Sequence, residues 1–267
     1  MTKKIFIALI IIGVAFGFGL SNLKSAQANS LVALEDLEAG DLVRGETFPA
    51  VYYYGVDGFR YVFPNDKTYF TWYDNFDDVR WISDEDLTKV QIGGNVTYRP
   101  GLRMVKINSD PKTYAVDMDG ELRHVTSETV ATDLYGSEWN TMIDDVPDSF
   151  FGNYFYGDPI NAAGDYDKEQ VMNDSPDINT DKGLVEPEEV SIYDGDYAPS
   201  AITIDAGSNV RFTNIGTDNH TVTADDLTWG SGTMAPEVSY IKKFEDAGNY
   251  YYFDSYHPDM TGVIIVE

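Results

Sequence analysis

The sequence predicts an all-β protein with two domains, and three observations support that fold class. Residues 42–159 alternate runs of aromatic and β-branched residues with Gly, Asp, Asn and Pro, a pattern typical of short strands joined by turns. From Glu189 onward, apolar residues recur at every second position in short segments, the spacing of an antiparallel β-sandwich. Between the two regions this periodicity disappears. We therefore expect a β-hairpin repeat domain over residues 36–160, an acidic linker over 161–188 and a β-sandwich over 189–267.

The first 28 residues predict export. Lys3 and Lys4 precede an uninterrupted apolar run over residues 5–20, and Ala26-Gln27-Ala28 offers a signal-peptidase site. The apolar run is short for a full membrane span. We expect cleavage of this signal peptide after Ala28, with an uncleaved membrane anchor as the alternative. The mature protein would then be periplasmic, at the cell surface or extracellular.

The chain is strongly acidic and has no cysteine. Its formal net charge is -27, and loss of residues 1–28 would remove three lysines and no acidic residue, giving -30. Such a surface excludes nucleic acid as a partner, because phosphate binding needs Lys and Arg. It also disfavours anionic membrane surfaces, whereas it favours cations or solubility in a salty medium. Without disulfides, the core of the exported protein must supply its stability.

The first predicted domain contains a weak internal repeat. Three segments share an apolar–Arg–ring–apolar pattern: Phe59-Arg60-Tyr61-Val62, Val79-Arg80-Trp81-Ile82 and Leu122-Arg123-His124-Val125. Two of them follow an Asp-Gly pair, which is a strong hairpin signal. We interpret the region as three related β-hairpins, in which His124 is a ring at a packing position. It resembles no family that we recognise.

Short helices are expected after two of these segments. Ser83-Asp84-Glu85-Asp86 has the form of a capping box. Residues 126–139 carry Val130, Leu134 and Trp139 and predict a single amphipathic helix. The tyrosine-bearing runs that begin at Lys67 and Lys112 are interpreted as hairpin strands.

The aromatic residues of this domain allow two interpretations. Rings in runs such as Tyr52-Tyr53-Tyr54, Tyr69-Phe70 and Trp72-Tyr73 can stack on sugars, which would indicate a carbohydrate or other cell-surface partner. Aromatic residues are also favourable in strands and fill small β cores. We expect packing, with a carbohydrate partner as the alternative.

The linker is rich in Asp, Asn, Gly, Pro and Glu, as solvated linkers are. Residues 177–188 partly match a calcium loop, with ligand types at Asp177, Asn179, Asp181 and Glu188. The sixth position is Lys182 instead of Gly, and no helical pattern flanks the segment. We therefore expect a solvated linker rather than a calcium site.

One loop near the C-terminus carries three candidate metal ligands. Residues 248–253 and 263–266 predict two strands, and the loop between them has the spacing D-x-x-H-x-x-M. A fourth candidate, His220, lies upstream in a loop-like segment. A carboxylate, two imidazoles and a thioether that meet in this way would form a compact metal site.

Residues 248–262 read G-x-Y-x-Y-x-D-x-x-H-P-x-M-x-G. Apart from Asp at the position of Cys, this segment resembles the copper loop of the cupredoxins, closest to the short loop of amicyanins and some plastocyanin-like proteins. Segments 201–204, 210–214 and 231–236 also follow in the order of that family. The resemblance covers residues 189–267 and implies a Greek-key β-sandwich with a copper site.

Carried over residue by residue, the resemblance implies a metal site made of His220, Asp254, His257 and Met260. No cysteine is present to supply a thiolate in place of Asp254. The resemblance also implies that Asn214 hydrogen-bonds across to the ligand loop and that Pro258 restrains it. Two imidazoles and a carboxylate suit Cu(II) first and Zn(II) second, and they do little to stabilise Cu(I).

We therefore expect an exported copper-binding protein with a modified site. One alternative is an electron carrier of the plastocyanin or amicyanin type, which needs reversible redox cycling. Another is a structural or adhesive surface protein that uses the domain as a metal-free scaffold. No enzymatic activity is predicted, because the sequence contains neither G-x-S-x-G nor H-E-x-x-H nor a phosphate-binding glycine loop.

Overall fold

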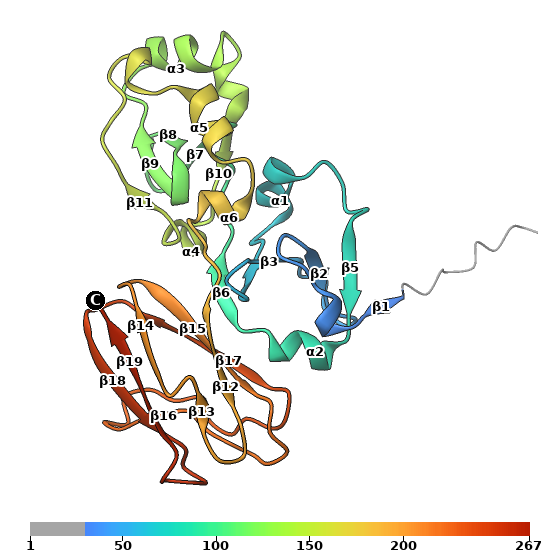
Figure 1. Ribbon diagram of the computed structural model, residues 1–267. Coiled ribbons are helices and arrows are strands. Elements are labelled where there is room, and N and C mark those ends of the chain that lie inside the picture. The colour runs from blue at the N-terminus through green and yellow to red at the C-terminus, as the bar shows by residue number, and fades with distance from the viewer. Residues whose placement is uncertain (1–29) are drawn as a thin grey trace, which may run out of the picture. The chain divides into compact units, whose positions relative to one another are not determined.

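The structure, a computed structural model, describes residues 30–267 and confirms the all-β fold class (Figure 1). Strands within this range form four sheets, with short helices between them. None of the described helices has the length and apolar character that crossing a bilayer requires. The predicted signal peptide, residues 1–28, lies outside the described residues.

Two sheets occupy the region predicted as the hairpin domain. In spatial order, the first sheet contains β1 (Leu31–Val32), β5 (Val79–Ile82), β2 (Leu42–Arg44), β3 (Tyr52–Tyr54), β4 (Arg60–Val62) and β6 (Ile92–Asn95). The second contains β10 (Ile143–Asp145), β7 (Met104–Lys106), β8 (Tyr114–Val116), β9 (Glu121–His124) and β11 (Phe155–Tyr156).

The two sheets repeat one arrangement. The three middle strands, β2-β3-β4 and β7-β8-β9, are antiparallel. A parallel strand flanks each side: β5 and β6 in the first sheet, β10 and β11 in the second. The prediction of three hairpins is therefore wrong for the middle copy, because residues 79–82 form β5. The apolar–Arg–ring–apolar pattern does not specify which strand is the partner. The buried position also differs between copies: Tyr61 in the first, Ile82 in the second, and Leu122 and Val125 in the third.

The helices and 3-10 turns of the described chain are short. They are η1 (Leu34–Asp36), α1 (Asp66–Trp72), α2 (Asp84–Lys89), η2 (Met118–Gly120), α3 (Glu128–Tyr135), η3 (Trp139–Met142), α4 (Asp148–Phe151), η4 (Ala163–Asp165), α5 (Lys168–Asp174) and α6 (Ile178–Asp181). Ser83 is the predicted N-cap, because its hydroxyl accepts a hydrogen bond from the Asp86 N–H at 3.0 Å. The Asp86 carboxylate accepts from the Ser83 hydroxyl at 2.8 Å, so the reciprocal bond of a full capping box is not formed.

Two local predictions are wrong. The run that begins at Lys67 is helix α1, capped by Asn65, whose Oδ1 accepts from the Thr68 N–H at 2.9 Å. The predicted helix over residues 126–139 is shorter, since α3 is followed by Gly136 at a φ of 84°. That left-handed conformation ends the helix, and Trp139 starts the separate turn η3.

The predicted linker contains two packed helices, α5 and α6. Ile178 is fully buried among the apolar residues of the first sheet, and Asn179 Oδ1 accepts from the Val56 N–H at 3.0 Å. Acidic residues start both helices, since Asp167 and Asp177 are the N-caps. Asp and Asn therefore serve as caps here rather than as a solvated tether. The division of the chain into two domains stays a prediction.

Two four-stranded sheets form the C-terminal sandwich, drawn in orange and red in Figure 1. One sheet contains β13 (Tyr197–Ala198), β12 (Glu188–Ile192), β15 (Ser208–Asn214) and β17 (Ser239–Phe244). The other contains β14 (Ala201–Ile204), β19 (Thr261–Val266), β18 (Gly248–Phe253) and β16 (Thr223–Ala224). The predicted strands are present, but the sheets are mixed, because β12 pairs in parallel with β15 and β14 with β19.

The sandwich core explains why the strands alternate in sequence. Val190, Val210, Phe212, Tyr252 and Ile264 are fully buried in one apolar cluster between the sheets. Tyr252 packs edge-on against Phe212, with 5.3 Å between ring centroids. The core therefore fixes the ends of β15 and β18, the strands that lead into the predicted site.

Asp181 is a buried acid that should make stability depend on pH. Burial raises its pKa to about 6 from an ordinary 3.8. Its Oδ1 accepts from the Asp119 N–H at 3.0 Å, whereas its Oδ2 is buried without a partner. Because the folded-state pKa is the higher one, the stability from this group is full below about pH 4 and is lost as pH rises through about 6.

We therefore predict that Asp181→Asn stabilises the protein at pH 8, by up to about 3 kcal/mol for a shift of about two pKa units. Near pH 4 the variant should match the wild type, because Asp181 is then protonated. Denaturant unfolding across this pH range measures both. Identical pH profiles for the two proteins would contradict the prediction.

Candidate metal centre

The candidate site lies at one end of the sandwich and uses two segments. His220 lies between β15 and β16 and is fully buried. A pair of backbone hydrogen bonds with Met234 holds it, from the His220 N–H at 3.1 Å and from the Met234 N–H at 2.8 Å. Residues 231–236, which the sequence also singled out, thus support the first imidazole.

The second segment is the loop between β18 and β19. Three backbone bonds tighten it: His257 N–H to Asp254 C=O at 3.2 Å, Met260 N–H to His257 C=O at 2.8 Å, and Asp254 N–H to Met260 C=O at 3.1 Å. The D-x-x-H-x-x-M spacing is therefore the spacing of a closed turn. It brings Asp254 and His257 to the same side as His220.

The carboxylate of Asp254 is the centre of the site. It is fully buried, and its Oδ1 accepts from the Thr221 N–H at 2.9 Å, the Tyr256 N–H at 3.0 Å and the Thr221 hydroxyl at 3.3 Å. Its Oδ2 lies 2.6 Å from Nδ1 of His220 and 2.9 Å from Nδ1 of His257. One oxygen anchors the side chain, so the other is presented to both imidazoles.

These contacts keep Asp254 ionised. Burial raises its pKa, but the hydrogen bonds from His220 and His257 and from the backbone N–H groups of Tyr256 and Thr221 together hold that pKa below its ordinary value. A buried anion beside two imidazoles favours the binding of a cation.

Asp194 is a member of the site that the sequence did not single out. Its Oδ1 lies 3.3 Å from Nε2 of His220. Hydrogen bonds from the backbone N–H groups of Asp218 and Thr217 and from the Thr217 hydroxyl lower its pKa to about 2. Asp194 follows β12, far from His220 in sequence, and no motif connects the two. Only the pairing of β12 with β15 brings it there.

The remaining predicted residues surround this group. Met260 is buried in the sandwich core, at the end of the ligand loop. Asn214 is buried, and among the described residues its Nδ2 donates to the carbonyls of Asp218 and Met234, at 2.9 and 2.8 Å. It therefore supports the His220 segment, rather than the ligand loop as the resemblance implied. Pro258 follows His257 within the tight turn.

The site is open at one edge. The side chain of His257 is 42% exposed, whereas those of His220 and Asp254 are fully buried. Tyr256 beside it is held by a 2.9 Å hydrogen bond between its hydroxyl and that of Thr233. A ligand from solution can therefore reach the centre past His257.

The donor set fits a transition metal ion. One ligand atom each from His220, Asp254 and His257 lie within 4.8 Å of one another. Zinc and copper take imidazole nitrogen and carboxylate oxygen at about 2.0–2.2 Å, usually in sets of three or four. The distances from Asp254 Oδ2 to the two Nδ1 atoms are hydrogen-bond distances. A metal ion and the imidazole protons therefore compete for Oδ2 and the two Nδ1 atoms.

The comparisons with known proteins agree with this location. Residues 178–266 match the family model described as the cupredoxin-like domain. This part of the chain contains a cupredoxin-like domain, as the residues predicted, and the first strand of its sandwich, β12, begins at Glu188. No curated protein matches the chain.

Solved structures similar to the chain include a purple cupredoxin, an amicyanin and a copper-containing nitrite reductase. A purple cupredoxin from Nitrosopumilus maritimus is 23% identical over 30% of this chain and 99% of its own, with a TM-score of 0.29. A reduced amicyanin mutant is 28% identical over 30% of this chain and 82% of its own, with a TM-score of 0.29. A copper-containing nitrite reductase from Thermus scotoductus SA-01 is 23% identical over 30% and 22%, with a TM-score of 0.28.

Proposed function

We propose that the C-terminal domain binds a transition metal ion through His220, Asp254 and His257, with Cu(II) first and Zn(II) second. The observation that carries the proposal is the convergence of two Nδ1 atoms on one oxygen of a buried, anchored carboxylate. The cupredoxin-like family of the domain supports copper as the first candidate. Met260 would add at most a weak thioether ligand.

Each residue contributes a separate property to this site. Asp254 supplies the negative charge, and the donors on its Oδ1 leave only Oδ2 for the ion. His220 and His257 would supply neutral nitrogen ligands through Nδ1, with the ring proton of each on Nε2. The bound ion would supply Lewis acidity and, for copper, a redox centre. Without a thiolate the site does little to stabilise Cu(I), so metal binding is favoured over electron transfer.

The setting of this function is part of the same proposal. The basic start, the apolar run and the cleavage site over residues 1–28 support export to the periplasm, the cell surface or the medium. A metal-free scaffold stays the competing hypothesis, and it predicts no change in the protein when metal is added. The expectation of a non-enzyme stays a prediction.

Replacing either imidazole should abolish tight binding. We predict that His220→Ala and His257→Ala each weaken Cu(II) binding by about a hundredfold or more, because each removes one nitrogen ligand from a small set. Met260→Leu should change affinity far less. Calorimetric titration of the metal-free protein with Cu(II) measures this, with His124→Ala as the matched control. Wild-type protein that takes up no metal would exclude the proposal.

A thiolate at the carboxylate position should convert the site. We predict that Asp254→Cys with Cu(II) gains an intense absorption band in the red, since a His2Cys set with a weak axial Met gives a blue-copper centre. Asp254→Asn should stay without this band. A copper-bound Asp254→Cys protein that lacks the band would show that the ligand geometry differs from that of the blue copper sites.

Asp194 should act on the metal through His220. A metal-bound imidazole usually donates its other N–H to a carboxylate, and loss of that partner costs about 10–100-fold in affinity. We predict a loss of this size for Asp194→Ala. Asp196→Ala is the control, because it removes the same charge from an exposed position nearby. An equal loss of metal affinity in the two variants would show that Asp194 acts through its charge alone and not through its contact with His220.

A further inference from the structure

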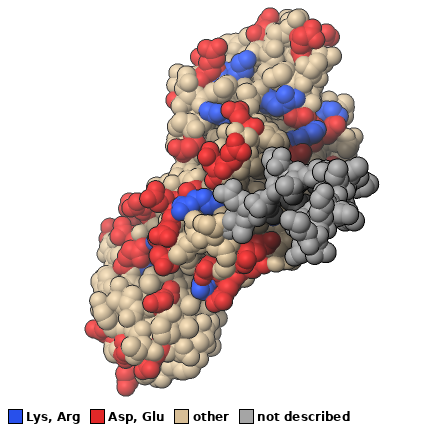
Figure 2. Space-filling model, turned by 90° about the vertical axis from the view of Figure 1, so that its right-hand side faces the viewer, with Lys and Arg blue, Asp and Glu red and all other residues tan. Residues whose placement is uncertain are grey.

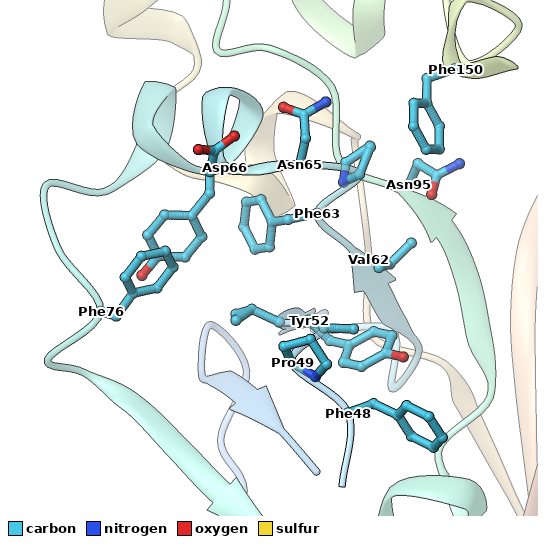
Figure 3. Close-up of a pocket in the computed structure, with 14 residues that line it drawn as sticks. Phe48, Pro49, Tyr52, Val62, Phe63, Asn65, Asp66, Phe76, Asn95 and Phe150 are labelled. Carbon is cyan, nitrogen blue, oxygen red and sulfur yellow. The ribbon is translucent and has the colours of Figure 1, made fainter. Parts of the chain in front are cut away.

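One large cavity of the described chain lies outside the cupredoxin-like domain. It has a volume of about 640 Å³ and lies at the edge of the first sheet. Its walls are the β2–β3 connection, the β4–α1 connection and the residue Phe76 that follows α1, with Phe150 of α4 at one side (Figure 3). A cavity of this size is in the range of ligand-binding pockets.

The walls of this cavity are apolar and aromatic. Phe48 is 71% exposed and Phe76 is 48% exposed, and Phe76 stacks on Tyr69 with 4.3 Å between ring centroids. Pro49 and Phe63 line the space between them (Figure 3). Exposed rings cost free energy in water, and an exposed aromatic patch is typical of a surface that meets a partner.

The polar groups at the edge are largely engaged. Asn65 Oδ1 accepts from the N–H and the hydroxyl of Thr68, at 2.9 and 3.2 Å. Asn95 Nδ2 donates to Asn153 Oδ1 at 2.9 Å. In Figure 3 the Asn65 and Asp66 side chains point away from Pro49 and Phe48. A sugar needs several hydroxyl partners, so these walls fit an apolar side chain better than a glycan.

The second sheet has a cavity at the corresponding place. It has a volume of about 270 Å³ and lies between the β7–β8 connection and the start of α3. Three pairs of lining residues occupy matching places in the two sheets: Pro49 and Pro111, Asn65 and Ser127, and Phe76 and Trp139. A cavity at this place is therefore a feature of the repeated fold. Lys112, His124 and Glu128 make the cavity of the second sheet polar, whereas the cavity of the first sheet has an aromatic lining.

The charge next to the aromatic cavity is negative. Exposed acidic residues within two positions of its lining residues in the chain are Glu46, Asp77, Asp78 and Asp148. Lys67 nearby pairs with Asp144. Two arginines also lie close: Arg44 covers the ring of Trp81 and donates to the Phe48 carbonyl at 3.3 Å, and Arg60 covers the ring of Tyr52. The four acidic residues outnumber these two arginines. Figure 2 shows Asp and Glu side chains spread over one face of the described residues, with fewer Lys and Arg among them. An occupant with positive charge beside its apolar group is complementary to this rim.

We propose that this cavity, with Phe48 and Phe76 at its mouth, binds a segment of a partner protein that carries one bulky apolar side chain flanked by Lys or Arg. The apolar side chain enters the cavity as the buried anchor. The flanking cations meet the acidic rim, where they add rate and specificity more than affinity. This role is independent of the metal centre.

Three synthetic peptides test the proposal on residues 29–267. The first has one tryptophan with glycine and two lysines on each side; the second replaces every lysine by glutamate, and the third replaces the tryptophan by glycine. NMR titration should show the first peptide shifting signals of residues 48–76. The second and third should bind at least about tenfold more weakly, because each lacks one of the two complementary features.

Variants assign the binding to the cavity. The double variant Phe48→Ala, Phe76→Ala should weaken the first peptide by about tenfold or more. Phe155→Ala is the matched control, since this ring is similarly exposed but does not line the cavity, and it should bind as the wild type does. The exposed positions leave folding intact, which thermal unfolding checks.

Three results would overturn the proposal: no shift at the cavity with the first peptide, equal binding of the lysine and glutamate peptides, or an unchanged double variant. Uncharged cello- or chito-oligosaccharides serve as the competing probes. Shifts at the cavity with these sugars and not with the peptide would assign it to a glycan instead.

Discussion

The candidate site depends on the way one carboxylate is held. Asp254 is buried, and three donors fix its Oδ1, so Oδ2 is directed at two imidazole nitrogens. An unpaired buried charge would cost several kcal/mol, and the neighbouring donors offset this. Two sets of backbone hydrogen bonds bring the three side chains together. One set closes the loop from Asp254 to Met260, and the other joins His220 to Met234. The cupredoxin-like sandwich supplies the rigid strand ends on which this depends.

Most of this site could be predicted from the sequence because it is local. The loop from Asp254 to Met260 contains three of the four candidates in seven residues, and its spacing alone indicates a closed turn. Asp194 could not be predicted, since it reaches His220 only through the pairing of β12 with β15. The role of Asn214 was inferred from the resemblance and differs, because its donors are used on the segment that carries His220.

The fold shows the same division between local and non-local information. The alternation that predicts the sandwich strands reflects one buried face, and the structure confirms it. The same alternation cannot tell a hairpin strand from a parallel return strand, which is why residues 79–82 were assigned to the wrong kind of pair. In residues 161–188 the many Asp and Asn residues indicated a linker. In the structure this segment forms short helices, because single apolar residues such as Ile178 are buried and Asp side chains cap the helix N-termini.

The most direct test of metal binding by His220, Asp254 and His257 is the position of a bound metal ion. Crystals of residues 29–267 grown with Cu(II), measured at wavelengths on both sides of the copper absorption edge, locate the ion without assumptions about its ligands. We expect a single strong anomalous peak within about 2.0–2.2 Å of Nδ1 of His220, Nδ1 of His257 and Oδ2 of Asp254. A peak elsewhere, or fully loaded crystals in which Asp254 still hydrogen-bonds both imidazoles, would contradict it.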